Sequence, residues 1–228
     1  LIKKIEQKNG ENFSNYSTVY YDTLTSMEMG LHAGNIVEMS TYRSVSNYVT
    51  GRNSALIPVP IAFKLNDSFC CAFRQDDSAL RDDFDKALNS MIADGTLITL
   101  TSEYITKFSA DAEPQAIDMP HFDGVQTIKV AVTGDLPPLD LILANGQPAG
   151  FNTAMISEIG RRTGRNIELV QIDSNARSAA LTSGQIDVVF WVTVPDDGGL
   201  DKNLDKPDAL DTTFPYFRDE IVHVDLKK

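Results

Sequence analysis

Apolar and polar positions change period several times along the chain, and Gly or Pro marks most of the changes. Residues 17–22 are β-branched and aromatic, which predicts a strand. Residues 24–33 place apolar side chains at helical spacing, and Gly34 supplies the stop that ends a helix. Residues 35–40 predict the next strand. A strand, a crossover helix and a strand together predict a parallel pair.

The next part of the chain predicts a short helix at 42–49 and an irregular or edge segment at 55–66, which two prolines interrupt. Residues 68–74 predict a strand. A long helix is expected over 78–95, and a second helix over 96–105. The apolar stripe expected to bury the long helix is formed by Leu80, Phe84, Ala87, Leu88, Met91 and Ile92.

The second half is more regular. The pattern predicts strands at 127–132, 166–172 and 187–194 and helices at 151–164 and 174–184. The first of these helices is expected to have Asn152 as its N-cap and Gly164 as its C-terminal stop. Residues 133–140 are expected to form a loop and residues 145–150 a turn. The unbroken apolar run at 187–194 is typical of a central parallel strand covered on both faces. Alternating strands and helices predict a doubly wound α/β fold.

One sequence pattern, in which a helix ends at a Gly and a strand follows, occurs twice in the chain. "LHAGNIVEMST" at 31–41 and "LTSGQIDVVFW" at 181–191 share the Leu-x-Ala/Ser-Gly-x-Ile spacing. Two units of similar design would each contribute one such step. Because ligands of open parallel sheets bind at the carboxyl ends of strands, the strands after Gly34 and Gly184 are expected to carry ligand contacts at their far ends.

Composition mainly excludes function classes. The chain of 228 residues has a formal net charge of −12, which argues against nucleic acid or an anionic membrane surface as its partner. Its three histidines are scattered without ligand spacing, and no Gly-rich phosphate loop or CxxC motif is present, so no cofactor and no metal are expected. The adjacent Cys70 and Cys71 are expected to be small buried thiols. The acidic runs at 81–85 and 195–208 are expected to be solvated.

Residues 128–190, with their strand, Pro-Pro loop, N-G-x-x-x-G-F turn and L-x-S-G-x-I-D step, resemble the first lobe of family 3 extracellular solute-binding proteins. "FPYF" at 214–217 is similar to the segment that closes that lobe. Residues 69–105 resemble the family's C-terminal strand and helices, and 17–49 resembles part of its second lobe. The resemblance implies a two-lobed type II periplasmic-binding fold, each lobe a mostly parallel sheet flanked by helices.

The order of these segments differs from the family, which predicts either a circular permutant or a piece of a tandem array. The expected division is an incomplete second lobe without its first strand (1–67), the closing strand and helices of the first lobe (68–106), a linker (107–124), the main part of the first lobe (125–218) and a hinge or return strand (219–228).

The resemblance also implies positions for ligand contacts, although two recognition charges of the family are missing. The family's ammonium-binding Asp falls at Tyr42, and no Arg follows the strand at 187–194. Arg177 is therefore weighed as an anion contact against a solvated surface residue, and Trp191 as a stacking residue against core filling. The full set of expected ligand-binding residues is Asp135, Leu136, Arg177, Trp191, Thr193 and Tyr42. Asp140 is expected to be a solvated loop carboxylate.

The resemblance implies a monomeric receptor that closes over a small amino-acid-like, polar or aromatic ligand and delivers it to a membrane ABC permease. Its expected location is extracellular, as a membrane-anchored lipoprotein, or periplasmic. Two alternatives stay open. A dehydratase-like enzyme on the same fold would need a general acid or base, for which Asp135 or a carboxylate near Asp219 is available. A sensory or scaffolding module would instead bind another protein.

Overall fold

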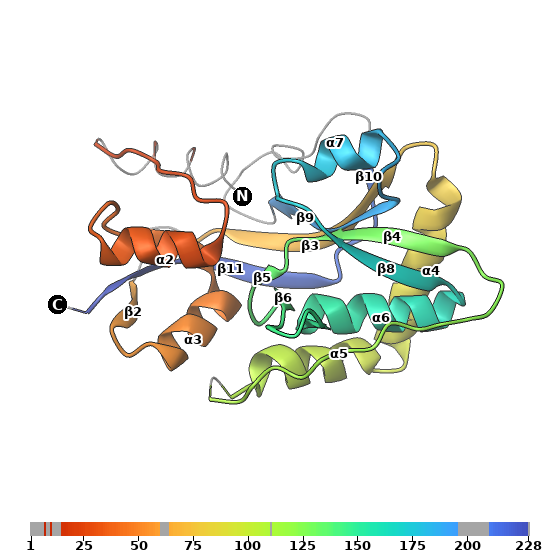
Figure 1. Cartoon of the computed structure of the whole chain (residues 1–228), viewed down its shortest axis with the longest axis horizontal. Helices are drawn as coiled ribbons and strands as arrows, with labels where there is room; N and C mark the ends of the chain where they lie inside the picture. The colour runs from red at the N-terminus through yellow and green to blue at the C-terminus, as the bar shows by residue number, and fades with distance from the viewer. Residues whose placement is uncertain are drawn as a thin grey trace. The chain divides into compact units, whose positions relative to one another are not determined.

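The computed structural model describes residues 7, 10, 15–59, 64–109, 111–195 and 210–227. The chain forms two compact units. Unit 1 comprises residues 1–69, 193–206 and 217–228, and unit 2 comprises residues 70–192 and 207–216. The predicted α/β class is confirmed (Figure 1). The acidic run at 195–208, expected to be solvated, lies outside the described residues except for Pro195.

Unit 1 is built around the long strand β11. Its elements are α2 (Leu24–His32), β1 (Met39–Tyr42), α3 (Arg43–Arg52), β2 (Leu56–Val59), the first part of β3 (Asn66–Arg74) and β11 (Phe217–Leu226). β1, β2 and β3 each pair with β11 in antiparallel orientation. β2 lies off the main strand order, in agreement with the edge position expected for its Pro-interrupted sequence.

The parallel pair predicted near the N-terminus is wrong. Residues 17–22 are not assigned to a strand, and they are mostly exposed. The strand predicted at 35–40 begins only at Met39, where it pairs with Val224. β-branched composition favours an extended chain, but a strand also needs a partner. The helices predicted at 24–33 and 42–49 are confirmed as α2 and α3.

Unit 2 holds the remaining elements. They are the end of β3, α4 (Ser78–Ala93), α5 (Thr96–Thr101), the π-helix η1 (Ser102–Thr106), β4 (Thr127–Val132), β5 (Asp135–Leu136), β6 (Asp140–Ile142), β7 (Pro148–Ala149), α6 (Phe151–Thr163), β8 (Asn166–Gln171), α7 (Arg177–Thr182), most of β9 (Val188–Pro195) and β10 (Leu210–Thr212). The region expected to be only a loop and a turn thus contains the small antiparallel sheet β5-β6-β7.

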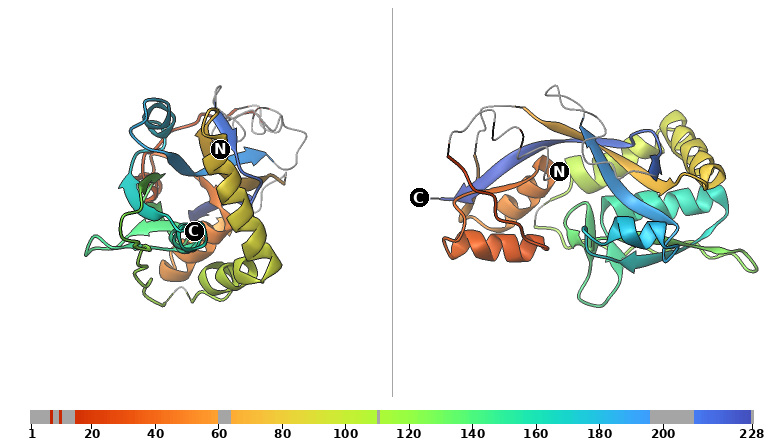
Figure 2. Two further views of the ribbon diagram at one scale, coloured as in Figure 1. Left: turned by 90° about the vertical axis from the view of Figure 1, so that its right-hand side faces the viewer. Right: turned by 90° about the horizontal axis from the view of Figure 1, so that it is seen from above.

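The main sheet of unit 2 has the order β3-β9-β4-β8, with β10 on β3. β4 is parallel to both β8 and β9. The apolar run of β9 therefore lies inside the sheet, as its sequence predicted. α6 lies on one face of this sheet and α7 on the other (Figure 1), and α4 packs alongside α6 (Figure 2).

One hydrophobic core cluster of unit 2 packs β3, β4, β9 and β10 against α7, and a second set of apolar contacts joins β3 to α4. Phe73 and Phe84 meet edge to face, with ring centres 5.1 Å apart. Cys70 and Cys71 are buried free thiols, as expected, and burial raises the pKa of Cys71 well above its ordinary value. Ile92 departs from the predicted stripe, since it is 51 % exposed.

Segment 107–124, expected to be a linker, is tied to unit 2 along much of its length. Ala116 forms a β-bridge with Ala149. The side chain of Asn166 accepts from Phe122 N at 2.6 Å and donates to the carbonyls of Phe122 and Val125. The lack of periodicity correctly predicted an irregular backbone, but not that side chains of other elements would hold it.

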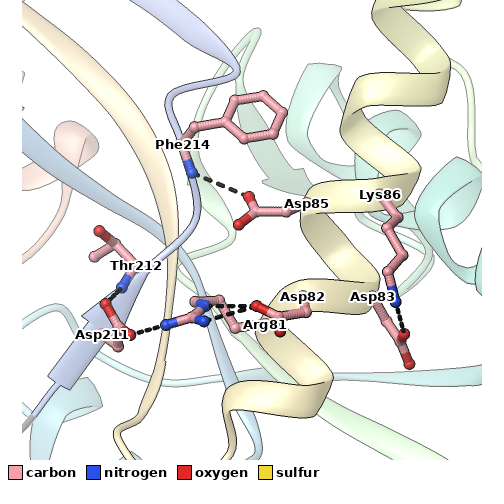
Figure 3. A network of polar contacts seen from close by, with 8 residues as sticks. All are labelled: Arg81, Asp82, Asp83, Asp85, Lys86, Asp211, Thr212 and Phe214. Atoms are coloured by element: carbon pink, nitrogen blue, oxygen red, sulfur yellow. Dashed lines mark hydrogen bonds and ion pairs between the residues drawn. The ribbon is translucent and has the colours of Figure 1, made fainter.

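The acidic run at 81–85 on α4 is not simply solvated, as was expected. Arg81 pairs with both Asp82 and Asp211, and Asp85 accepts a hydrogen bond from Phe214 N at 3.0 Å (Figure 3). These contacts fix β10 and the segment after it against α4. That segment leads to Tyr216 and into β11.

No helix in the described ranges is both long and apolar enough to cross a membrane.

Candidate functional site

The carboxyl ends of β4 and β9 lie at the same edge of the unit 2 sheet because the two strands are parallel. After β4 the chain turns at Gly134, whose φ of +74° suits a residue without a side chain; a Cβ there would also lie 2.8 Å from Ile142 Cγ1. Asp135 and Leu136 follow as β5, and both are partly exposed. This edge is where an open α/β sheet binds a ligand.

Arg177 and Trp191 contact each other in unit 2. Arg177 begins α7 and Trp191 lies on β9, and each is 8 % exposed. Arg177 Nη1 donates to the Trp191 carbonyl at 3.1 Å, and the guanidinium carbon lies 5.2 Å from the centre of the Trp191 ring. The expectation of a solvated surface Arg177 is therefore wrong: the side chain crosses from α7 to β9 and lies over an aromatic face.

Asp140 is 1 % exposed, which corrects the expectation of a solvated loop carboxylate. Its Oδ2 accepts hydrogen bonds from Thr133 N and Thr133 Oγ1, each at 2.8 Å. Burial raises the pKa of Asp140, whereas the Thr133 bonds and the charge of Arg177 act in the opposite direction. The Asp140 carboxylate thus joins the end of β4 to β6 and has Arg177 as its electrostatic partner.

A buried pair next to this carboxylate was missed in the sequence. Tyr216 OH donates to Asn152 Oδ1 at 3.0 Å, and Tyr216 stacks on Phe190 with ring centres 5.3 Å apart. Burial raises the pKa of Tyr216 well above its ordinary value, and Cys71, Cys70 and Asp140 add to the effect. Asn152 is thus not the N-cap of α6, a place that Gly150 takes. Its position inside an apolar-striped helix gave no signal of a Tyr partner 64 residues away.

In unit 1 the structure brings Tyr42 and Thr193 together. Tyr42, at the end of β1, is 1 % exposed, and its hydroxyl donates to Asp67 Oδ2 at 3.0 Å. Burial and the Asp67 charge raise the pKa of Tyr42 well above its ordinary value, and a hydrogen bond with the Thr193 side chain acts in the opposite direction. Asp67, which is fully buried, was also missed; it lies between Asn66 and Ser68 at the polar start of β3, which gave no signal of burial.

Asp219 lies directly opposite Asp67 in the β3–β11 ladder, so the two side chains share one face of the sheet. Asp219 Oδ2 accepts from Ser44 N at 3.1 Å and from Ser44 Oγ at 2.5 Å, which caps the amino end of α3 from a neighbouring strand. Burial raises the pKa of Asp219, whereas the Ser44 bonds and the charge of Arg43 oppose the shift. Buried carboxylates of this kind can bind cationic groups or hold protons.

No group of three or more His, Cys, Asp or Glu side chains in the described segments is arranged to hold a metal ion. The residues described above in unit 2 and in unit 1 are instead suited to hydrogen bonding, charge pairing and aromatic stacking. These interactions are the means by which proteins recognise small organic molecules.

Residues 128–197 match the model of the bacterial extracellular solute-binding proteins, family 3. The chain carries a family 3 solute-binding segment. This family 3 segment contains β4 to β9, and with them Asp135, Leu136, Arg177, Trp191 and Thr193. The family recognised in the sequence is thus confirmed over these residues. Its members are described as extracellular and as solute-binding proteins. No curated protein sequence matches the chain.

Three solved structures are similar to the chain at low identity. The crystal structure of Tv2483 bound to L-arginine is 11 % identical with a TM-score of 0.47, and the match covers 99 % of this chain and 68 % of that one. Full-length CbnR complexed with its target DNA is 13 % identical with a TM-score of 0.44, and the match covers 98 % of this chain and 58 % of that one. Apo YehZ from Escherichia coli is 10 % identical with a TM-score of 0.35, and the match covers 98 % of this chain and 74 % of that one. The assignment therefore rests on the family 3 segment and not on these likenesses.

Proposed function

We propose that the chain is the solute-binding receptor of an ABC importer and that it captures a small amino-acid-like, polar or aromatic molecule. Its ligand contacts would be Asp135, Leu136, Arg177 and Trp191 in unit 2 and Tyr42 and Thr193 in unit 1. The observation that carries the proposal is the family 3 segment, which covers the parallel strands β4 and β9. Asp135 follows the carboxyl end of β4, and Trp191 lies on β9. A membrane permease would receive the ligand from a monomeric receptor that is anchored as a lipoprotein or free in the periplasm.

We also propose that the chain is a circular permutant of the family order, with a piece of a tandem array as the alternative. Support comes from the division into units: residues 69–105, which resemble the family's C-terminal part, fall from residue 70 on in the same compact unit as residues 128–192 of the family 3 segment. A chain reordered to begin at Val125, with residue 228 joined to residue 1 by a Gly/Ser linker, would fold with the same circular dichroism spectrum. An unfolded product from the reordered chain would favour the tandem array.

Thermal shift against a metabolite library tests the receptor. A ligand at about 100 times its dissociation constant stabilises the folded state by about 2.7 kcal/mol, which raises the Tm of a chain of this size by roughly 5–10 °C. The expected result is a saturable rise without turnover. Trp191→Ala is expected to abolish the rise, whereas the exposed Glu168→Gln on β8 keeps it.

The other outcomes separate the alternatives. Chemical change of a stabilising compound would indicate a dehydratase-like enzyme with Asp135 or Asp219 as its acid or base. If no compound shifts the Tm, the chain is a sensory or scaffolding module and not a receptor.

A further inference from the structure

The guanidinium of Arg177 is held by groups of its own unit. It donates to the Trp191 carbonyl at 3.1 Å and lies over the Trp191 ring, and the residue is 8 % exposed. These contacts fix both the backbone and the side chain of Trp191 in β9. Because Nη1 is engaged by the Trp191 carbonyl and the residue is only 8 % exposed, the guanidinium is held in the protein rather than presented to solvent.

The charge of Arg177 is also balanced inside the unit. The Asp140 carboxylate, 1 % exposed, is close enough for the Arg177 charge to favour its ionised form. Asp140 Oδ1 is buried as well, so solvent screens the charge of this carboxyl group little. A ligand carboxylate at Arg177 would be desolvated and would have to compete with the Asp140 carboxyl group for the guanidinium charge, which is unfavourable.

Asp135 offers the opposite chemistry at the same edge of the sheet. Its Oδ2 is buried and has no hydrogen-bond partner in the described part of the chain, although the residue as a whole is partly exposed. A buried carboxylate oxygen without a donor is an unusual state in a folded protein. An ammonium group supplies both the N–H donors and the positive charge that this oxygen lacks. The net charge of −12 further favours the approach of cations over anions.

We propose that the ligand is an amine that carries no free carboxylate, that Asp135 is the counter-ion that determines this preference, and that Arg177 is a positioning residue for Trp191. The inference rests on the proposed function and narrows its ligand class. Arg177 then does not contact the ligand, so this inference removes Arg177 from the ligand contacts proposed above and replaces the anion contact expected from the sequence.

Fluorescence titration of Trp191, the only tryptophan of the chain, tests the ligand class. The probes are three amines, each with its parent amino acid: 2-phenylethylamine with phenylalanine, histamine with histidine, and agmatine with arginine. Phenylacetate is the probe for an anion without an amine. At least one amine is expected to bind at least tenfold more tightly than its amino acid, and phenylacetate is expected not to bind.

Equal or tighter binding of an amino acid, or binding of phenylacetate, overturns the proposal and leaves the receptor function in place. If all seven probes leave the emission unchanged, each compound that raises the Tm in the library screen is tested in the same titration. A library ligand with a carboxylate, or one without an amine, overturns the proposal. A screen with no hit overturns the receptor function as well.

Variants separate the two roles. Asp135→Asn is expected to weaken amine binding at least tenfold, whereas Asp173→Asn, the same charge change at an exposed position before α7, leaves it within twofold. Arg177→Lys keeps the charge but loses the planar contact, so the emission of Trp191 is expected to shift before any ligand is added. Amines stay preferred in this variant.

An anion contact would behave differently. If Arg177 bound a ligand carboxylate, Arg177→Lys would weaken the binding of amino acids more than the binding of their amines. It would also leave the Trp191 emission of the ligand-free protein unchanged. That result would reject the positioning role. Circular dichroism of each variant shows that it is folded.

Discussion

Asp219 and Asp67 illustrate how a residue's surroundings, rather than its type, set its chemistry. Both are acids on strands, and both are buried on the same face of the β3–β11 ladder. Asp219 is bound by the amino end of α3 through Ser44, and Asp67 by the hydroxyl of Tyr42. The two carboxylates thus tie β3 and β11 to the β1–α3 corner of unit 1.

The raised pKa of Asp219 predicts a pH dependence of stability. A carboxyl whose pKa is raised by folding stabilises the folded state fully below its unfolded pKa, about 3.9, and loses this contribution as the pH rises through the folded value. Urea unfolding at intervals from about pH 4 to pH 7 is expected to show a fall in unfolding free energy that Asp219→Asn reduces. The exposed Asp111→Asn is the control and keeps the wild-type slope. Equal slopes for Asp219→Asn and wild type would contradict the prediction.

The residues that sequence reasoning placed wrongly share one property. Asp140 follows two prolines and a Leu, which is loop composition, and Asn152 begins a helix, which is where a capping side chain is expected. Each is instead buried by a partner distant in the sequence or by a short strand pairing: Asp140 pairs across β5–β6, and Asn152 meets Tyr216. Local composition carries no information about such partners.

At the scale of elements, periodicity was a good guide where an element buries its own apolar face. α4, α6 and β9 follow their predicted ranges closely. It failed at 17–22, where the pattern is suited to a strand but no partner strand is present in the described residues. Periodicity also predicted only a linker at 107–124, before β4. Side chains of β8 and α6 hold the backbone of this segment, although the segment has no hydrophobic period of its own.

Asn166 is the main support of that segment and provides a prediction at this scale. Asn166→Ala removes one acceptor and two donor bonds to the backbone of Phe122 and Val125, and unpaired backbone groups are expected to cost about 1–3 kcal/mol of unfolding free energy. Chymotrypsin is expected to cut faster at Phe122 in this variant. The exposed Gln185→Ala serves as the matched amide control. Unchanged cleavage together with unchanged urea unfolding would show that other contacts hold the segment.

For the whole molecule, the excess of acidic over basic residues affects how fast charged ligands reach the protein rather than which fold it adopts. The chain has 32 Asp and Glu against 20 Lys and Arg. A field of one sign raises the local concentration of oppositely charged ligands and is screened by salt. It therefore acts in the same direction as the preference for amines inferred from Asp135.

Association rates provide the corresponding test. The association rate constant of a bound amine, followed by stopped-flow fluorescence of Trp191, is expected to fall about tenfold between low salt and about 0.5 M salt. A neutral compound that binds is the control, and its rate is expected to change little. A rate for the amine that does not depend on salt would mean that the net charge plays no part in capture.

The sequence by itself determined the α/β class, the order of most helices and strands, the interior position of β9 and the family of residues 128–197. These follow from periodicity, turn residues and motifs, which are local. Only the tertiary structure decided that Arg177 lies on Trp191, that Asp140 and Asp67 are buried, and that the strands of unit 1 run antiparallel to β11. The reason is physical: the charge state and exposure of a side chain depend on what packs against it, and those partners come from distant parts of the chain.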